Sequence, residues 1–395
     1  METLFEQLLG LTGLHIFKVD EKHDGYFLHC ETYAKSCKCT KCGHVNTKVK
    51  QTYVRTIRDL PISGKRVYLI LYSKQYDCQQ CQSNYYEKYD FVEPNQNTTN
   101  RYSAYLYFLS KGVDLSYVSE KENISYKTVT RIVRHYSQQA VKAFYGYKTV
   151  KKIGIDEIAL RKGHRDFVVI ITDLDTHKII DILENRDKKG LIKYFQDKGT
   201  DFCQRIEVFC SDMWEGYLNT AKEVFPNAVI TADRFHVFAK LQDALDHTRK
   251  YLRKTFKEDE TLKGIRYLLL KNPENLNDKE LTELNDLLKN PKYELLKASY
   301  EAKNEFRNIY QSKIDVQKAN ELIEQWIKNN AKNRFLFNFI KFYKSWKNYI
   351  LNYFQNRLTT SIVEGINNKL KLIKRRAFGF LTFESFRLKA ITEFL

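Results

Sequence analysis

The spacing of apolar and polar residues changes several times along the chain, and the first regular pattern is alternation. Residues 52–59 and residues 65–76 alternate between apolar and polar positions, which is typical of strands with one buried face. Residues 61–64, which include a proline and a glycine, have the composition of a turn. The pattern therefore predicts a β-hairpin within the first hundred residues.

The spacing becomes helical from residue 101 onward. A first helix stops at Gly112, and a short one opens at Leu115. Residues 123–125 form a turn whose Ser125 caps a longer helix that runs to Tyr136. Short helix, tight turn and second helix together predict a helix-turn-helix arrangement.

The second helix of this pair has one basic face and one apolar face. Its basic face carries Lys127, Thr128, Arg131 and Arg134. Its inward positions are Val129, Ile132 and Val133. Such a helix suits insertion into a DNA major groove. An ordinary pair of packed helices would give the same pattern, and the DNA-binding interpretation is preferred because it agrees with the charge of the whole chain.

Runs of β-branched residues then alternate with helical segments up to residue 234. Strands are predicted at residues 153–155, 167–172, 178–183, 205–210 and 228–231, and helices at residues 187–196 and 215–225. Three strands followed by helix, strand, helix and strand indicate an α/β domain with a mixed sheet.

The remainder of the chain is helical by pattern. Residues 235–354 are interrupted at Asn272-Pro273 and at Asn290-Pro291. One stripe of the last helical segment holds Glu364, Asn368, Lys371 and Arg375, opposite an apolar stripe of Ile362, Ile366, Leu370 and Ile373. A carboxylate followed by cations could meet a metal ion and a phosphate backbone, although an ordinary amphipathic surface helix has the same pattern.

Composition narrows the class of protein. The chain has 395 residues, enough for two or three domains, a net charge of +18, and 14% aromatic residues. An excess of basic residues interleaved with Tyr and Phe favours binding to nucleic acid. The alternative, that the charge serves only to keep the protein soluble, is less favoured. No apolar run is long enough to span a membrane, and the N-terminus lacks the basic start and cleavage site of a signal peptide, so an intracellular protein without a membrane partner is expected.

Cysteines are concentrated near the N-terminus. Cys39-Thr-Lys-Cys42 and Cys78-Gln-Gln-Cys81 lie on either side of the predicted hairpin. Two such knuckles place four thiolates within tetrahedral reach of one Zn²⁺. We therefore predict a structural zinc site made by Cys39, Cys42, Cys78 and Cys81, with Cys30 and Cys37 outside it.

Two acids stand out because each follows a predicted strand. Asp156 comes after the first strand of the α/β region and Asp212 after the fourth. Carboxylates at strand ends are well placed to bind a hard divalent cation, but Asp is also a common turn former. His236, after the fifth strand, is equally consistent with a structural histidine.

Several motifs together resemble a known family, the bacterial insertion-sequence transposases of the ISL type, which have a DDE catalytic domain. The motifs occur in the family's order and span nearly the whole chain. They are CTKCG, YDCQQC, GIDEIA from Gly154, SDMW from Ser211, ADRFHV from Ala232, VEGINNK from Val363 and IKRR from Ile373.

The resemblance implies a multidomain α/β protein with an RNase H-like catalytic core and a long all-helical insertion. The expected segments are a zinc ribbon at 1–95, a helix-turn-helix at 96–147, the first part of the RNase H-like core at 148–234, the insertion at 235–355, and the last part of the core, with the catalytic Glu helix, at 356–395. Glu157 follows Asp156 and would point to the other side of its strand. Asp166 is another nearby acid outside the implied triad.

The resemblance also implies the chemistry. It assigns Asp156, Asp212 and Glu364 to a triad that binds Mg²⁺ or Mn²⁺, and it gives His236, in a (C/D)xxH element, a role near the scissile phosphate. Double-stranded DNA, both transposon ends and target, is the implied partner, with a homodimer bridging two ends at the bacterial nucleoid in the cytoplasm. Backbone contacts beside the active site are assigned to Lys369, Lys371, Lys374, Arg375 and Arg376.

One segment departs from the family's pattern. The family often has Ser-Asn-Gly before Val-Glu-Gly, whereas this chain has Thr359-Thr360-Ser361. This departure supports an alternative function, a catalytically silent DNA-binding protein derived from a transposase that acts as a repressor.

Overall fold

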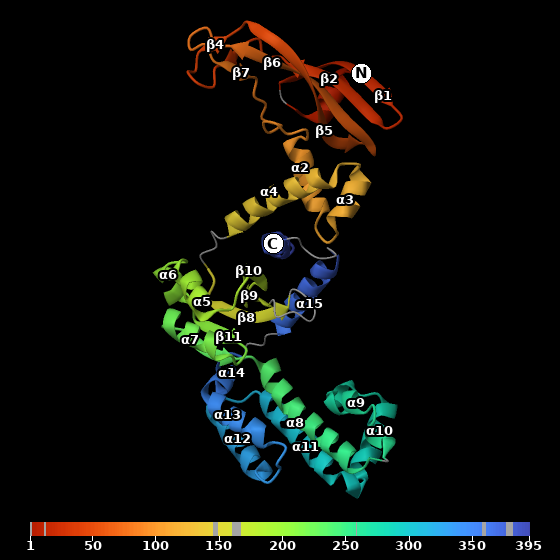
Figure 1. The fold of residues 1–395 in the computed structure, drawn as a ribbon, viewed down its shortest axis with the longest axis vertical. Coiled ribbons are helices and arrows are strands. Elements are labelled where there is room, and N and C mark those ends of the chain that lie inside the picture. Colours follow the sequence, from red (N-terminus) through yellow and green to blue (C-terminus); the bar gives the residue numbers. More distant parts are fainter. Residues whose placement is uncertain are drawn as a thin grey trace. The chain divides into compact units, whose positions relative to one another are not determined.

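The structure is a computed structural model that forms two compact units, Met1–Val141 and Lys142–Leu395 (Figure 1). It describes residues 2–11, 13–144, 149–159, 167–257, 259–357, 361–376 and 382–395.

A twisted β-sheet dominates the first unit. After α1 (Glu2–Leu9), the strands β1 (Leu14–Lys22), β2 (Gly25–Thr32), β6 (Lys65–Asp77) and β5 (Val49–Ile62) lie side by side in that order, and β7 (Asn84–Tyr86) pairs with β6. The predicted hairpin is confirmed as β5 and β6, with Ile57 opposite Leu69 in the buried core. Two short strands, β3 (Cys37–Lys38) and β4 (Val45–Asn46), pair beside it.

Three helices complete the first unit: α2 (Asn100–Leu109), α3 (Leu115–Glu122) and α4 (Tyr126–Phe144). Asn123 ends α3 in the left-handed conformation, φ 53°, which turns the chain sharply into α4. The backbone N–H of Thr128 donates to the hydroxyl of Ser125, at 3.3 Å, so the predicted cap is confirmed. Val129, Ile132 and Val133 are buried as predicted.

The second unit is built on the predicted mixed sheet. Its order is β10 (Lys178–Leu183), β9 (Phe167–Asp173), β8 (Lys152–Ala159), β11 (Val208–Ser211) and β12 (Val229–Ala232). The pairs β10–β9 and β9–β8 are antiparallel, whereas β8, β11 and β12 run parallel.

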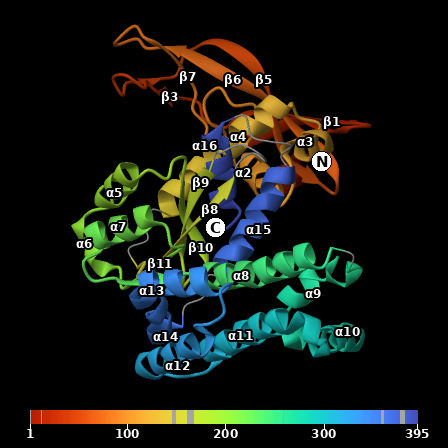
Figure 2. The same ribbon diagram turned by 60° about the horizontal axis from the view of Figure 1, so that its bottom comes forward.

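Helices cover the two faces of this sheet (Figure 2). On one face, α5 (Lys188–Gln196) and α7 (Glu215–Val224) bury Phe195 and Tyr217 in a cluster with Ile155 and Phe209 of the strands. The other face carries α15 (Ser361–Arg376), described below. The fourth strand was predicted to begin at residue 205, which is wrong, because residues up to Arg205 form the short helix α6 (Thr200–Arg205).

The helical insertion is confirmed between β12 and α15. It comprises α8 (Arg234–Thr255), α9 (Arg266–Leu270), α10 (Asp278–Lys289), α11 (Glu294–Gln311), α12 (Val316–Asn330), α13 (Phe337–Leu351) and α14 (Tyr353–Asn356), with single 3₁₀ turns at Glu260–Leu262, Pro273–Asn275 and Pro291–Tyr293. The last two turns lie at the predicted Asn-Pro breaks. An aromatic cluster around Phe306, Trp326 and Phe339 forms its core, as expected for aromatic stripes.

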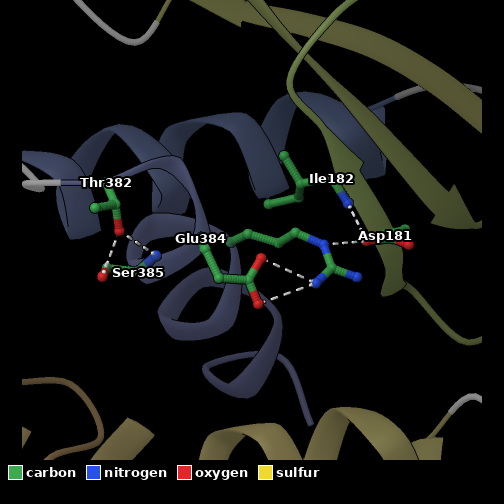
Figure 3. Close-up of polar contacts among 6 residues, drawn as sticks. Asp181, Ile182, Thr382, Glu384 and Ser385 are labelled. Carbon is green, nitrogen blue, oxygen red and sulfur yellow. Dashed lines mark hydrogen bonds and ion pairs between the residues drawn. The ribbon is translucent and has the colours of Figure 1, made fainter. Parts of the chain in front are cut away.

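The last helix, α16 (Phe383–Thr392), is held to the sheet by a buried ion pair (Figure 3). Arg387 Nε donates to Asp181 Oδ1 of β10 at 2.7 Å, and its Nη1 lies 3.3 Å from Glu384. Thr382 caps the helix by accepting from the N–H of Ser385. The C-terminal segment is thereby joined to the antiparallel side of the sheet.

Candidate active site and metal centre

Three aspartates follow the last paired residues of the parallel strands. Asp156 was predicted to follow its strand, which is wrong, because β8 continues to Ala159 and Asp156 lies within it, opposite Ile170 of β9. Ser211 of β11 is in register with Ile155 of β8 and with Ala232 of β12. The residues that follow these three, Asp156, Asp212 and Asp233, are therefore neighbours where the parallel pairing ends. Residues opposite one another in paired strands point to the same face, so the sheet itself brings these acids together.

The face on which these acids lie is the one that α15 covers. Gly154 and Cys210 are in register and lie two residues before Asp156 and Asp212, hence on the same face. Val363 of α15 packs there with Cys210 and Leu174, and a Cβ at Gly154 would come within 3.2 Å of the Val363 side chain. A bare backbone at position 154 thus lets α15 approach the strands closely, one residue before Glu364.

Asp156 is held by two donors. Its Oδ1 accepts from the N–H of Glu157 at 2.7 Å, and its Oδ2 accepts from Asn367 Nδ2 of α15 at 2.5 Å. The carboxylate is therefore fixed between its own strand and the helix that carries Glu364. Glu157 points to the opposite face, as expected, where it contacts Arg186 and the hydroxyl of Tyr217.

Asp233 and His236 form a pair at the start of α8. Asp233 caps the helix by accepting from the N–H of Phe235 at 2.9 Å, and its Oδ2 lies 2.7 Å from His236 Nδ1. The hydrogen bond with Asp233 is the main reason that the pKa of His236 is raised, and the charges of Asp156 and Asp212 raise it further. His236 is thus within electrostatic reach of both Asp156 and Asp212.

Burial raises the pKa of Asp156 and of Asp212 above the ordinary range of aspartate. A hydrogen bond from a backbone N–H and attraction to His236 lower the pKa of each acid in part, and the neighbouring carboxylates add repulsion. Buried carboxylates that repel one another at one edge of a sheet are typical of a site that a cation would neutralise.

We expect Asp212→Asn to raise the thermal midpoint of the protein at neutral pH in buffer without added Mg²⁺. The raised pKa means that the charged form of Asp212 costs free energy in the folded state. This cost is absent below the unfolded pKa of about 3.9 and complete above the raised folded pKa, so the stabilisation should grow as the pH rises through that window.

Calorimetry across that pH range, with the structural zinc left in place, measures the effect. Asp201→Asn, which replaces an exposed acid of α6, is the matched control and should leave the midpoint unchanged. A lower midpoint for Asp212→Asn at neutral pH would contradict the burial argument.

Glu364 lies exposed on α15, on the turn before Asn367. Among the described residues, the only group of three or more metal-binding side chains whose ligand atoms all lie within 4.8 Å of one another is a cysteine cluster. Asp156, Asp212 and Glu364 are therefore carried by adjoining elements but are not drawn into so tight a group.

That cysteine cluster is the predicted set: Cys39, Cys42, Cys78 and Cys81. Sγ of Cys39 lies 3.6 Å from that of Cys81, and Sγ of Cys42 lies 3.4 Å from that of Cys78. A tetrahedral Zn²⁺ with bonds of about 2.3 Å places its sulfurs about 3.8 Å apart, so the four thiols fit one zinc ion. Cys37 lies outside the group, as predicted.

Both cysteine knuckles have the same backbone geometry. In the first, the N–H of Gly43 donates to the carbonyl of Cys39, and in the second the N–H of Gln82 donates to that of Cys78. The hydroxyl of Ser83 lies 3.4 Å from Sγ of Cys39, and its hydrogen bond, together with those of backbone N–H groups, lowers the pKa of the Cys39 thiol to about 5. Burial and the neighbouring sulfurs instead raise the pKa of Cys42 to about 12, so the charge of the group falls first on Cys39. A thiolate, the form that binds zinc, is thereby favoured before any metal arrives.

Comparison with known proteins decides the family. A family model described as a transposase, of the ISL3 type with a DDE domain, matches residues 153–390, and a model described as the zinc-finger of transposase IS204/IS1001/IS1096/IS1165 matches residues 35–81. The first match covers more than half of the chain. The chain belongs to the ISL3-type DDE transposases.

Two curated relatives agree with this assignment. The transposase for insertion sequence element IS1001 from Bordetella parapertussis is 28% identical over 397 residues, which cover 98% of this chain and 96% of the relative. The transposase for insertion sequence element IS1557 from Mycobacterium tuberculosis is 23% identical over 415 residues, which cover 95% of this chain and 92% of the relative. The likeness therefore extends from the zinc ribbon to the last helix.

The basic face of α4 in this transposase is open to solvent. Lys127, Arg131 and Arg134 are exposed, and Thr128 is half-buried. An open groove of about 520 Å³ is lined by Tyr126, Lys127, Thr130, Arg131, Arg134, His135 and Gln138. Aromatic and cationic side chains thus line one continuous surface.

The basic residues of α15 divide into two groups. Lys371, Arg375 and Arg376 are exposed. Lys374 Nζ instead donates to the carbonyl of Ala159 at 2.6 Å, and Lys369 Nζ donates to that of Glu393 at 2.5 Å. These two lysines tie α15 to β8 and to the C-terminal segment, so they are less available to DNA than the sequence suggested.

Some features of this transposase fall outside the predictions. Asp166, Thr359 and Thr360 are not among the described residues, so the departure before Val363 has no structural account. Asn367, which holds Asp156, was not predicted as a site residue; its position on the turn after Glu364 was the available signal. In the described parts of the chain, no helix is both long and apolar enough to cross a bilayer.

Proposed function

We propose that this transposase binds the terminal inverted repeats of its insertion sequence and cleaves and transfers DNA strands with Asp156, Asp212 and Glu364. One observation carries the proposal: Asp156 within β8 and Asp212 directly after β11 follow residues that are paired in register, and Val363 docks the Glu364 helix on the same face. Rigid elements thus present three carboxylates from one side of the sheet.

The residues present fit Mg²⁺ or Mn²⁺, because the site offers oxygen donors, which these hard cations prefer. Such ions, when bound, activate the attacking hydroxyl or water and stabilise the leaving oxygen.

The chain's own residues have distinct parts in this proposal. Asp156 and Asp212 concentrate negative charge on one face of the sheet, and Glu364 adds a third carboxylate from α15. His236, oriented through Nδ1 by Asp233, presents its other ring nitrogen as a donor for a phosphate oxygen. Lys371, Arg375 and Arg376 attract the DNA backbone beside them.

The fold supports the finer domain assignment that goes with this function. Three antiparallel strands followed by two parallel ones, with α15 on one face, agree with an RNase H-like core. We propose the five segments given above: 1–95, 96–147, 148–234, 235–355 and 356–395. A homodimer that bridges two ends, working on DNA at the nucleoid in the cytoplasm, completes the proposal.

End recognition is assigned to the first unit, where α3 and α4 form the helix-turn-helix. We expect the double variant Arg131→Ala, Arg134→Ala to bind end DNA at least tenfold more weakly, because both cations face the open groove of α4. Each lost phosphate contact should also lower the slope of log K against log salt by about 0.9.

Fluorescence anisotropy of a labelled end duplex at several salt concentrations measures both quantities. Lys18→Ala, which removes an exposed cation of β1, is the control and should bind as the parent does. An unchanged salt slope in the double variant would remove α4 from the DNA interface.

The decisive experiment for the function uses the parent protein. A duplex that carries the element's inverted repeat is incubated with the full chain and either Mg²⁺ or Mn²⁺, and nicks are mapped on both strands. Metal-dependent nicks at the transposon end are expected. Tight binding without any nick would instead favour the catalytically silent repressor.

A further inference from the structure

The amide of Asn367 links α15 to Asp156 and is nearly inaccessible to solvent. Only 7% of the residue is exposed. Its Nδ2 donates to Asp156 Oδ2 at 2.5 Å, across 211 positions of sequence. A buried polar side chain that contacts a carboxylate of the candidate site calls for a structural or functional explanation.

The orientation of this amide is fixed by its partner. Asp156 already accepts from the N–H of Glu157 through Oδ1, and as a carboxylate it has only acceptors to offer. Asn367 must therefore turn its NH₂ group toward Asp156, because the reverse orientation would set two oxygens against each other. Its carbonyl oxygen is consequently directed away from Asp156.

That carbonyl oxygen, Oδ1 of Asn367, is buried and has no hydrogen-bond partner among the described residues. An unsatisfied buried acceptor costs about 1–3 kcal/mol, so proteins seldom retain one without a use. A divalent cation, or a water molecule bound to it, would satisfy Oδ1, and Asp156, which Nδ2 of the same amide contacts, is one of the carboxylates expected to bind such a cation.

We propose that Asn367 is part of the divalent-metal site, with Nδ2 positioning Asp156 and Oδ1 facing the bound ion or its water. This inference rests on the proposed function and adds one uncharged residue, Asn367, to the proposed metal site. Glu364 precedes Asn367 by three positions, about 4.5 Å along the helix axis and 60° around it, so one face of α15 supplies both. The helix then presents a charged ligand and the residue that orients a second one.

A purely structural tie between α15 and β8 is the competing explanation. It predicts that losing the amide lowers stability equally with and without metal. A positioning role predicts a specific loss of metal affinity, since partners that orient ligands contribute about 10–100-fold to metal binding.

Asn367→Leu, which keeps the size of the side chain and removes both polar atoms, separates these explanations. Mn²⁺ binding to the full chain, with zinc in place and no DNA, is measured by electron paramagnetic resonance, together with the shift in thermal midpoint that Mn²⁺ causes. We expect at least tenfold weaker binding and a smaller shift. Asn348→Leu, at an exposed position of α13, should match the parent.

Asn367→Asp provides a second variant of the same shape if the leucine variant does not fold. It keeps the oxygen and loses the donor, so we expect Mn²⁺ to bind while cleavage at saturating metal falls at least tenfold. Parent-like Mn²⁺ affinity in Asn367→Leu, or parent-like cleavage in Asn367→Asp, would overturn the proposal. Because Mn²⁺ binding is read without DNA, its result stands apart from whether the protein cleaves transposon ends.

Discussion

Glu364→Gln should reduce metal-dependent cleavage of an inverted-repeat duplex by at least about a thousandfold, equivalent to about 4 kcal/mol of transition-state stabilisation. An amide of the same shape cannot supply the negative charge that a divalent cation requires. Asp156→Asn should have a similar effect, because that residue loses an anionic oxygen on the sheet side of the same site. Quantified strand cleavage under single-turnover conditions measures both losses.

The fold should tolerate the Glu364 substitution. The side chain of Glu364 is exposed and makes no hydrogen bond or ion pair with any described residue, whereas its neighbour Val363 is fully buried against the strands. A large loss of cleavage would therefore report on chemistry and not on packing. Anisotropy with end DNA should give a parent-like affinity, which tests that separation directly.

The control for this experiment is an acid of no assigned role. Asp201→Asn replaces an exposed carboxylate of α6 and should cleave as the parent does. If Glu364→Gln or Asp156→Asn also cleaves at the parent's rate, the triad assignment is wrong. In that case the Mn²⁺ affinity of the Asn367 variants would show whether the acids still bind metal for another purpose.

Local patterns were sufficient to predict many elements but not their partners. The β5–β6 hairpin, the mixed sheet and the breaks in the insertion follow from periodicity and from Pro, which act within a few residues. The β1–β2 hairpin was not predicted, and its alternation is interrupted by a register shift between Ile16 and Lys18. The six-residue helix α6 spans fewer than two helical turns, too few for the helical spacing of apolar residues to repeat.

The candidate site shows the same limit. Asp156 and Asp212 could be selected because each follows a run of β-branched or apolar residues, although β8 in fact continues past Asp156 to Ala159. The sequence does not state that β8 and β11 are adjacent and in register. Asp233 becomes their neighbour only through the pairing of β11 with β12. The partnership of Asn367 with Asp156 depends on a helix that docks after a long insertion, so no local pattern encodes it.

The zinc site was predictable because its geometry is local to two knuckles, and it carries the other large expected effect. Cys39→Ser should release zinc and destabilise the zinc-ribbon part of the first unit. Around the site, the buried cluster consists of Cys39, Cys78, Tyr76 and Tyr85, a small core between the short strands β3 and β4 and the adjoining ends of β6 and β7. Metal binding contributes about 10–16 kcal/mol in small zinc-finger peptides, far more than such a core provides.

Metal analysis of the purified variant, together with limited proteolysis of residues 35–81, measures this effect. Cys37→Ser is the matched control, because Cys37 lies two positions away in β3 but outside the four-sulfur group. We expect one zinc per chain in Cys37→Ser, and substoichiometric zinc with rapid cleavage of the knuckles in Cys39→Ser. One zinc per chain in Cys39→Ser would exclude that thiol as a ligand, since three remaining sulfurs and a neutral hydroxyl bind zinc less tightly than four thiolates.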